Sequence, residues 1–260
     1  MRSWLLAAAC AAASVVTGCS HVHVPLASPS VYAVHPEVVA FHARGVELRI
    51  DVDVYNPLPS PLATPHYRYA LDVEGRTLAN GRSGVADLPP AGIGTVSIPV
   101  VLPWRDVAAC TGGLDGRADV AFDLSGAVTL PVFGDEVELP FVHAGTLPVV
   151  LAPVCRAVGT AAVGGREPDA PGAVIVEIEN PNGFDLDVAP LAFALVVGDR
   201  AHDGLRPEQG AAVVGARSTR TLRLVGGAAA ATPVVTQAAG VRVRTTGVLD
   251  TPHGPLYLGD

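Results

Sequence analysis

Hydrophobic and polar residues alternate one by one in two stretches of this chain that lie about 120 residues apart, which is a domain length. In the first, residues 46–54, five aliphatic side chains alternate with four charged ones. In the second, residues 174–179, every second position is valine or isoleucine, and Glu177 and Glu179 lie between or beside them. A period of two points the two sets to opposite faces of a strand. One buried and one wetted face predicts an antiparallel sheet at both places.

These two strands open a longer internal repeat. Each runs into an Asn-Pro pair, Asn56-Pro57 in the first copy and Asn180-Pro181 in the second. Proline ends strand pairing because it has no backbone donor, and the asparagine side chain bonds the backbone that follows. We therefore expect each pair to stop a strand and turn the chain at one end of a sheet. Further strands correspond in order in the two copies, at residues 67–73 and 191–197 and then at 94–102 and 218–225.

Short strands and frequent turns are predicted for the rest of the chain. Glycine (28 residues) and proline (23 residues) are abundant and aromatic residues make up only 5%, which favours strands over long helices. The Phe-Gly-Asp segment at 133–135 predicts a hairpin turn, with the His-Gly pair at 253–254 as its counterpart. We expect an all-β protein with two tandem immunoglobulin- or fibronectin-III-like antiparallel β-sandwiches, at residues 31–145 and, more divergent, at 146–260.

The N-terminus has the layout of a bacterial lipoprotein signal peptide. A positive start precedes an apolar run at residues 4–16, whose length of about 13 residues suits a leader and is too short to span a bilayer. The run ends in "VTGC", which resembles a lipobox, in which the cysteine is acylated and the leader is cut before it. We expect a lipoprotein signal peptide at 1–18, lipidation at Cys19 and a tether at 19–30. Ordinary cleavage beside a free cysteine is the alternative.

The leader also predicts where the protein resides. Several acyl chains at one residue anchor a protein stably, so the membrane is an expected partner through the N-terminal lipid. Ser20, rather than an aspartate, follows the cysteine, which resembles the outer-membrane default of Gram-negative lipoproteins. We expect a cell-envelope protein on the outer membrane, facing the periplasm. His21 and His23 lie in the tether and are interpreted as a polar spacer rather than a metal site.

The first copy of the repeat resembles the WHy domain of the type 2 late embryogenesis abundant (LEA14-like) proteins. Its segment "YRYALDVEGRTLANGRSGVADLPPAGIGTVSIPVVL" follows that family's order of strand, "L-A-x-G" turn and proline-rich release. The second copy keeps "NPNGFDLDV" and "FALVVGD" but lacks the clear turn and release. The resemblance implies a seven-stranded sandwich, an association with desiccation and stress responses, and no catalytic residues.

The net charge and the absence of catalytic motifs limit the functions that the sequence allows. The net charge is −8 and all 17 basic residues are arginines without a basic cluster, so no nucleic acid partner is expected. Nucleophile-elbow and zinc-protease motifs are absent, and we expect no enzyme, no cofactor and no metal. Asp51 and Asp53 share a strand face and would suit calcium with a further acid, but a wetted polar face is the expected role. Four histidines of the first copy are expected at the surface: His35, His42, His66 and His143.

Two function classes remain open. The first is a non-catalytic, membrane-tethered stress or interaction module that contacts an unknown protein or envelope partner through its sandwich surface. The alternative is a carrier that holds an apolar ligand or lipid within or between the sandwiches. A carrier needs an apolar pocket of roughly 300 Å³ or more, whereas an interaction module can be packed solid.

Two further cysteines lie in the sandwiches, Cys110 in the first and Cys155 at the start of the second. An exported protein meets an oxidising compartment, so we expect a disulfide that clips the two domains together. Its stabilisation is on the order of 4 kcal/mol for a loop of about 45 residues. Two buried free thiols are the alternative, since cysteine packs well as a small apolar group.

Overall fold

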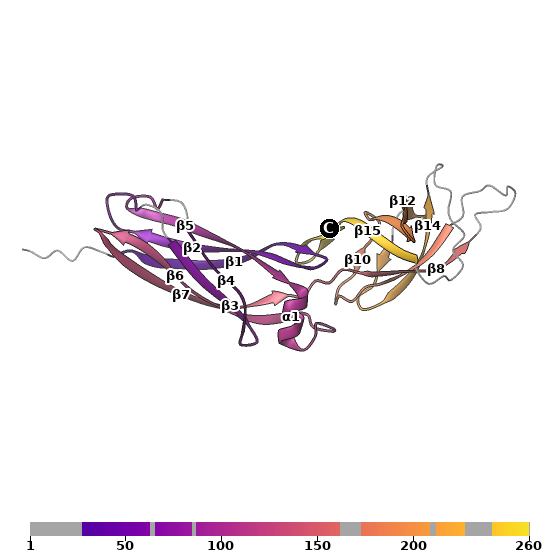
Figure 1. The fold of residues 1–260 in the computed structure, drawn as a ribbon, viewed down its shortest axis with the longest axis horizontal. Coiled ribbons are helices and arrows are strands. Elements are labelled where there is room, and N and C mark those ends of the chain that lie inside the picture. Colours follow the sequence, from indigo (N-terminus) through magenta and orange to yellow (C-terminus); the bar gives the residue numbers. More distant parts are fainter. Residues whose placement is uncertain are drawn as a thin grey trace, which may run out of the picture.

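The computed structural model describes residues 28–62, 66–84, 87–161, 173–208, 212–226 and 241–259. Within these residues the chain is almost entirely β, with one short helix, α1 (Trp104–Thr111). Figure 1 shows two β lobes along the long axis of the molecule, with α1 close to where they meet. The predicted all-β sandwich fold is confirmed.

The first half of the chain forms two antiparallel layers. One sheet has the order β5-β2-β1 and the other the order β4-β3-β6-β7. Helix α1 follows β5. The strands are β1 (Ser30–His42), β2 (Gly45–Asn56), β3 (His66–Val73), β4 (Arg76–Gly84), β5 (Gly92–Pro103), β6 (Asp119–Val132) and β7 (Asp135–Pro148).

The second half repeats the same neighbour relations. Strands β14, β9 and β8 lie in the order of β5, β2 and β1, and β12-β11-β15-β16 follows the order β4-β3-β6-β7. Strands β12 and β14 also pair, so the two layers of this half are joined at one side. The strands are β8 (Val154–Ala161), β9 (Ala173–Glu179), β10 (Leu186–Asp187), β11 (Ala192–Val197), β12 (Arg200–Pro207), β13 (Val213–Val214), β14 (Thr219–Gly226), β15 (Val241–Thr251) and β16 (Gly254–Leu258).

The alternation of residues 46–54 decides which side of β2 faces the core. Its five aliphatic side chains are at most 3% exposed, while Arg49 on the opposite face is exposed. On β9, Val174, Val176 and Ile178 are fully buried in the same way. Burying one such side chain stabilises the fold by about 1.5–3 kcal/mol, which fixes the strand register because a slip by one residue would expose the whole set. The predicted face of each strand is confirmed.

The turns lie close to where the sequence places them. Phe133 and Gly134 join β6 to β7 with φ values of 53° and 93°, the positive pair that suits a tight hairpin. In the second half the turn lies at 252–253, and Gly254 already begins β16. Strand β7 continues to Pro148, three residues past the domain boundary predicted at 145.

The last strand joins the two halves. β16 pairs antiparallel with β15 and also parallel with the end of β1, through Phe41 opposite Leu256 and His42 opposite Tyr257. The Ala43 N–H donates to the Tyr257 carbonyl at 3.2 Å. The β5-β2-β1 sheet therefore continues through β16 into the second half, a connection that the sequence did not indicate.

Candidate functional site

Asn56 of the first Asn-Pro pair organises the end of the β5-β2-β1 sheet. It is the last residue of β2 and is completely buried. Its Oδ1 accepts a bond from the Leu58 N–H at 3.0 Å, and its Nδ2 donates to the carbonyls of Ser60 (3.0 Å) and Pro89 (2.9 Å). A buried carboxamide needs such partners. Asn56 therefore fastens the loop after β2 to the segment that leads into β5.

Asn180 does the same in the second half, directly after β9. It is 1% exposed. Its Oδ1 accepts from the Asn182 N–H at 3.0 Å, and its Nδ2 donates to the Phe184 carbonyl at 2.7 Å. The same amide also reaches the carbonyls of Val214 (3.2 Å) and Gly215 (3.1 Å). The two asparagines thus hold equivalent backbone positions in the two halves.

A short β-bridge accompanies each asparagine. Leu62 pairs with Leu88 in the first half, and Leu186 of β10 pairs with Val214 of β13 in the second. Leu62 and Leu186 stand at the same distance along the chain from their asparagines. The correspondence between the copies therefore extends from strand order to individual hydrogen bonds.

A corner between the halves is built around Asn182. Its side chain bonds both backbone groups of Leu151 in the connecting segment, each at 2.8 Å. Its carbonyl accepts from the Arg217 N–H at 2.9 Å, and the Arg217 guanidinium donates to the Gly116 carbonyl of the first half at 2.8 Å. The connecting segment is thus tied to the second half at a point next to the first.

The acidic pair expected on the wetted face of β2 is engaged by neighbouring strands. Asp51 accepts bonds from Ser97 (2.6 Å) and Arg49 (3.2 Å), and Asp53 accepts from Thr95 at 2.7 Å. His35 lies 3.6 Å from Asp53. Among the described residues no three histidine, cysteine, aspartate or glutamate side chains gather as metal ligands. These carboxylates therefore form part of a polar face that runs across β1, β2 and β5.

The other histidines are placed apart from one another. His42 stacks on Tyr257 with ring centroids 5.5 Å apart, and its Nε2 lies 3.7 Å from a Glu47 oxygen. His143 stacks on Phe122 at 6.2 Å. His66 is exposed at the start of β3.

Cys110 and Cys155 are free thiols in the structure, so the disulfide expected from the sequence is not formed there. Cys110 lies on α1, which packs against the first half, whereas Cys155 is opposite Ile178 in the β8–β9 pair of the second half. Burial raises the pKa of the Cys155 thiol to about 11, because a thiolate loses its hydration there. A raised pKa lowers the reactivity of this half-buried thiol, because the thiolate is the nucleophile.

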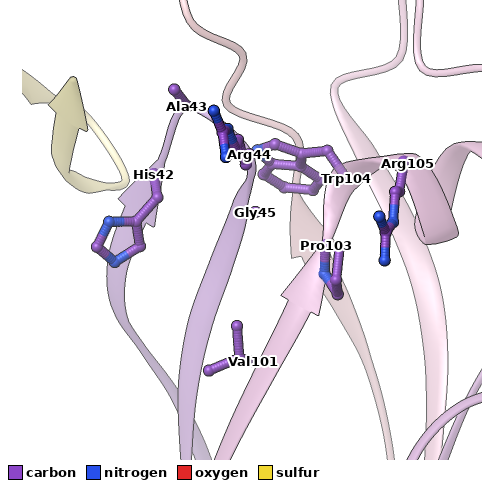
Figure 2. Close-up of a pocket in the computed structure, with 8 residues that line it drawn as sticks. All are labelled: His42, Ala43, Arg44, Gly45, Val101, Pro103, Trp104 and Arg105. Atoms are coloured by element: carbon purple, nitrogen blue, oxygen red, sulfur yellow. The ribbon is translucent and has the colours of Figure 1, made fainter. Parts of the chain in front are cut away.

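A cavity that could hold a small molecule lies beside α1. It measures about 680 Å³ and is lined by residues of the β1–β2 turn, the end of β5 and the start of α1. Figure 2 shows Gly45 at its centre, with His42 on one side and Trp104, Pro103 and Arg105 on the other. No local sequence pattern marks this pocket, because its lining residues come from two segments about 60 residues apart.

The predicted lipidation residue, Cys19, lies outside the described residues, as do the leader and most of the tether. In the described part of the chain, no helix has the length and apolar character to cross a membrane.

Most of the first half, from Asp51 in β2 to residue 145 in β7, lies in a segment that matches a known family. Residues 51–145 match the family model of the late embryogenesis abundant proteins, LEA_2. This match supports the type 2 LEA family for the first half. No curated protein matches the chain.

Among solved structures, a protein from Archaeoglobus fulgidus is 16% identical, with a TM-score of 0.36, over 47% of this chain and 100% of its own. A protein from Arabidopsis thaliana is 20% identical, with a TM-score of 0.38, over 46% of this chain and 80% of its own. A bacterial adhesin from Mobiluncus mulieris is 11% identical, with a TM-score of 0.33, over 86% of this chain and 100% of its own.

Proposed function

We propose that this chain is a non-catalytic, membrane-anchored envelope lipoprotein with two tandem WHy domains, which protects cells during desiccation or related stress. The observation that carries the proposal is the LEA_2 match at residues 51–145. That family suggests a stress-associated role without catalysis. The envelope location and the tandem arrangement of WHy domains go beyond that match.

The tandem arrangement draws its support from the equivalence of the two halves. Strand order agrees, and Asn56 and Asn180 hold the backbone at equivalent positions. Hydrogen bonds of a buried side chain depend on the loop conformation around it, so this agreement is more demanding than a shared strand count. The second half is therefore interpreted as a divergent copy of the first.

The anchor draws its support from the lipobox and from the length of the tether. Nine positions separate Cys19 from Ser28, where the described chain begins. A chain of that length spans at most about 30 Å when fully extended. A lipid on Cys19 would hold the first half next to the membrane surface.

The surface that would act is the polar face of the β5-β2-β1 sheet. Its carboxylates are fixed by hydrogen bonds from Ser97 and Thr95 and by Arg49, which also pairs with Glu37. These groups present hydrogen-bond donors and acceptors at fixed positions to a protein or envelope polymer. Because they are already held in place, they lose less conformational entropy when the partner binds. The role needs binding and no turnover.

A carrier with its ligand between the sheets gains no support from the pocket. All eight lining residues come from one sheet and α1, and none comes from the facing sheet of the first half. Buried apolar side chains pack between those sheets, and the hollow that residues of both sheets line beside β1 and β7 measures only about 190 Å³, below the roughly 300 Å³ that a carrier needs.

The decisive experiment uses a deletion strain that carries the wild-type gene, Cys19→Ala or the matched control Ser20→Ala. Wild type and Ser20→Ala should fractionate with the membrane, incorporate labelled palmitate and restore survival after drying. Cys19→Ala should lose the label and the membrane association. Equal membrane association of all three proteins without label would refute the anchor. Unimpaired survival of the deletion strain would refute the stress role.

A further inference from the structure

The pocket beside α1 combines an apolar lining with positive charge. Val101, Pro103 and the Trp104 ring supply the apolar surface, while Arg44 and Arg105 supply the charge. Its lining residues, all of them described, include no acidic side chain. This is unusual in a chain of net charge −8, because cations concentrated in one concave place attract anions selectively.

Neither arginine side chain is held by a strong ion pair or hydrogen bond within the described residues. Within the described residues, the Arg44 guanidinium has no hydrogen-bonding or ionic partner, and only its backbone is engaged, accepting from the Trp104 N–H at 2.8 Å. Arg105 lies 3.2 Å from its neighbour Asp106, with 85% of its side chain exposed. Such a surface pair is readily exchanged for another anion.

The start of α1 adds backbone donors, of which the Trp104 N–H already bonds the Arg44 carbonyl. Its N-cap residue, Pro103, makes no side-chain cap, so the first N–H groups of the helix have no partner within it. Trp104 is only 6% exposed, and among the described residues its indole Nε1 is buried without a hydrogen-bond partner. A buried donor without an acceptor is unfavourable, and an anionic group that reached it would supply that acceptor.

Gly45 lines the pocket where two strands approach each other closely. A Cβ there would lie 2.6 Å from the Leu102 carbonyl oxygen, because β5 approaches the β1–β2 turn closely. Val101 lies on the outer face with 66% of its surface exposed. The hollow has a volume of about 680 Å³, which lies in the range of small-molecule sites.

We propose that this pocket binds a single-chain amphiphile with an anionic head, such as a fatty acid. The head would lie between the Arg44 and Arg105 guanidiniums, and the chain would cover Val101, Pro103 and the Trp104 ring. The proposal goes beyond the stress role and does not depend on the lipid anchor, since every residue that it uses belongs to the first half.

Tryptophan fluorescence tests the proposal directly. The chain has two tryptophans, Trp4 and Trp104, so the full chain with Trp4→Phe reports on the pocket alone. Titration with dodecanoate or dodecyl phosphate, kept below micelle formation, should change Trp104 emission saturably. Dodecyl maltoside, with the same chain and a neutral head, should bind at least tenfold more weakly. A preference for one of the two anions would identify the head group.

Substitutions of pocket residues test where the anion binds. Arg44→Gln and Arg105→Gln should each weaken anion binding on the order of tenfold, as expected for a charge-assisted hydrogen bond. Val101→Glu, which adds a carboxylate at an exposed position, should abolish it. Arg82→Gln on β4 is the matched control and should bind like the parent. Equal binding of dodecanoate and dodecyl maltoside, unchanged affinity in both arginine variants, or no saturable signal would overturn the proposal.

Discussion

Replacing Asn56 tests whether the Asn-Pro pairs hold the sandwich ends together. Asn56→Ala removes three hydrogen bonds of 2.9–3.0 Å from a fully buried position. At about 1 kcal/mol for each bond, the expected loss in free energy of unfolding is about 3 kcal/mol, and more if the freed backbone groups find no water. With a urea m-value of about 1–3 kcal/mol/M, the midpoint should fall by 1 M or more.

Asn56→Asp separates hydrogen bonding from packing. The aspartate has the same shape and still accepts from the Leu58 N–H, but it turns an oxygen toward the carbonyls of Ser60 and Pro89. A buried carboxylate that faces two carbonyl oxygens is strongly unfavourable, so at pH 7 this variant should be at least as unstable as Asn56→Ala. Lowering the pH should recover part of the loss, because protonation removes the charge and restores one donor.

The control is Asn80→Asp, at an exposed position on β4. Its urea midpoint should stay within the scatter of the parent, because surface substitutions rarely exceed about 0.5 kcal/mol. A loss below about 1 kcal/mol in both Asn56 variants would show that the bonds of this side chain do not stabilise the fold.

Three further outcomes are expected. Cys155 should react with a thiol reagent at pH 8 about a hundredfold more slowly in the native protein than in denaturant, because its pKa rises from 9.0 to about 11; equal rates would contradict its burial. Since the folded state resists losing this proton, the contribution of Cys155 to stability should decline as the pH rises from 9 towards 11; a Cys155→Ala variant that shows the same decline would exclude the thiol as the cause. A fragment that ends after Pro148 should give a cooperative β-domain melt at a lower temperature than the intact chain, because Phe41 and His42 lose their pairing with β16; a disordered fragment would mean that the halves share one core.

Local patterns in the sequence predict the strands and their buried faces. They do not predict which distant residues bond to the side chains at the strand ends. The alternation of residues 46–54 fixes the buried face of β2, and the repeat places an asparagine at each sandwich end. The acceptors of those asparagines, at Pro89 and at Val214 and Gly215, lie more than thirty positions downstream. No local signal marks them, since a carbonyl is common to every residue.

The candidate site was less predictable for a related reason. Gly45 and Trp104 come together only because β2 pairs with β5 over its full length. An oxidising compartment favours a disulfide between Cys110 and Cys155, but the structure places them on separate elements, α1 and β8, as free thiols. Sequence distance carries no information about which side of a sandwich a helix covers.

The pairing of β16 with β1 has a consequence for how the chain folds. Phe41 and Leu256 are roughly 200 positions apart, so their contact forms only when almost the whole chain is available. Until then the end of β1 is an uncovered edge of the kind that recruits other chains. Because a ribosome or a translocation channel releases the N-terminus first, β1 emerges long before β16, and its end stays unpaired on this side until β16 is released. Chaperone holding during that interval should therefore matter more for this protein than for a single sandwich of the same fold.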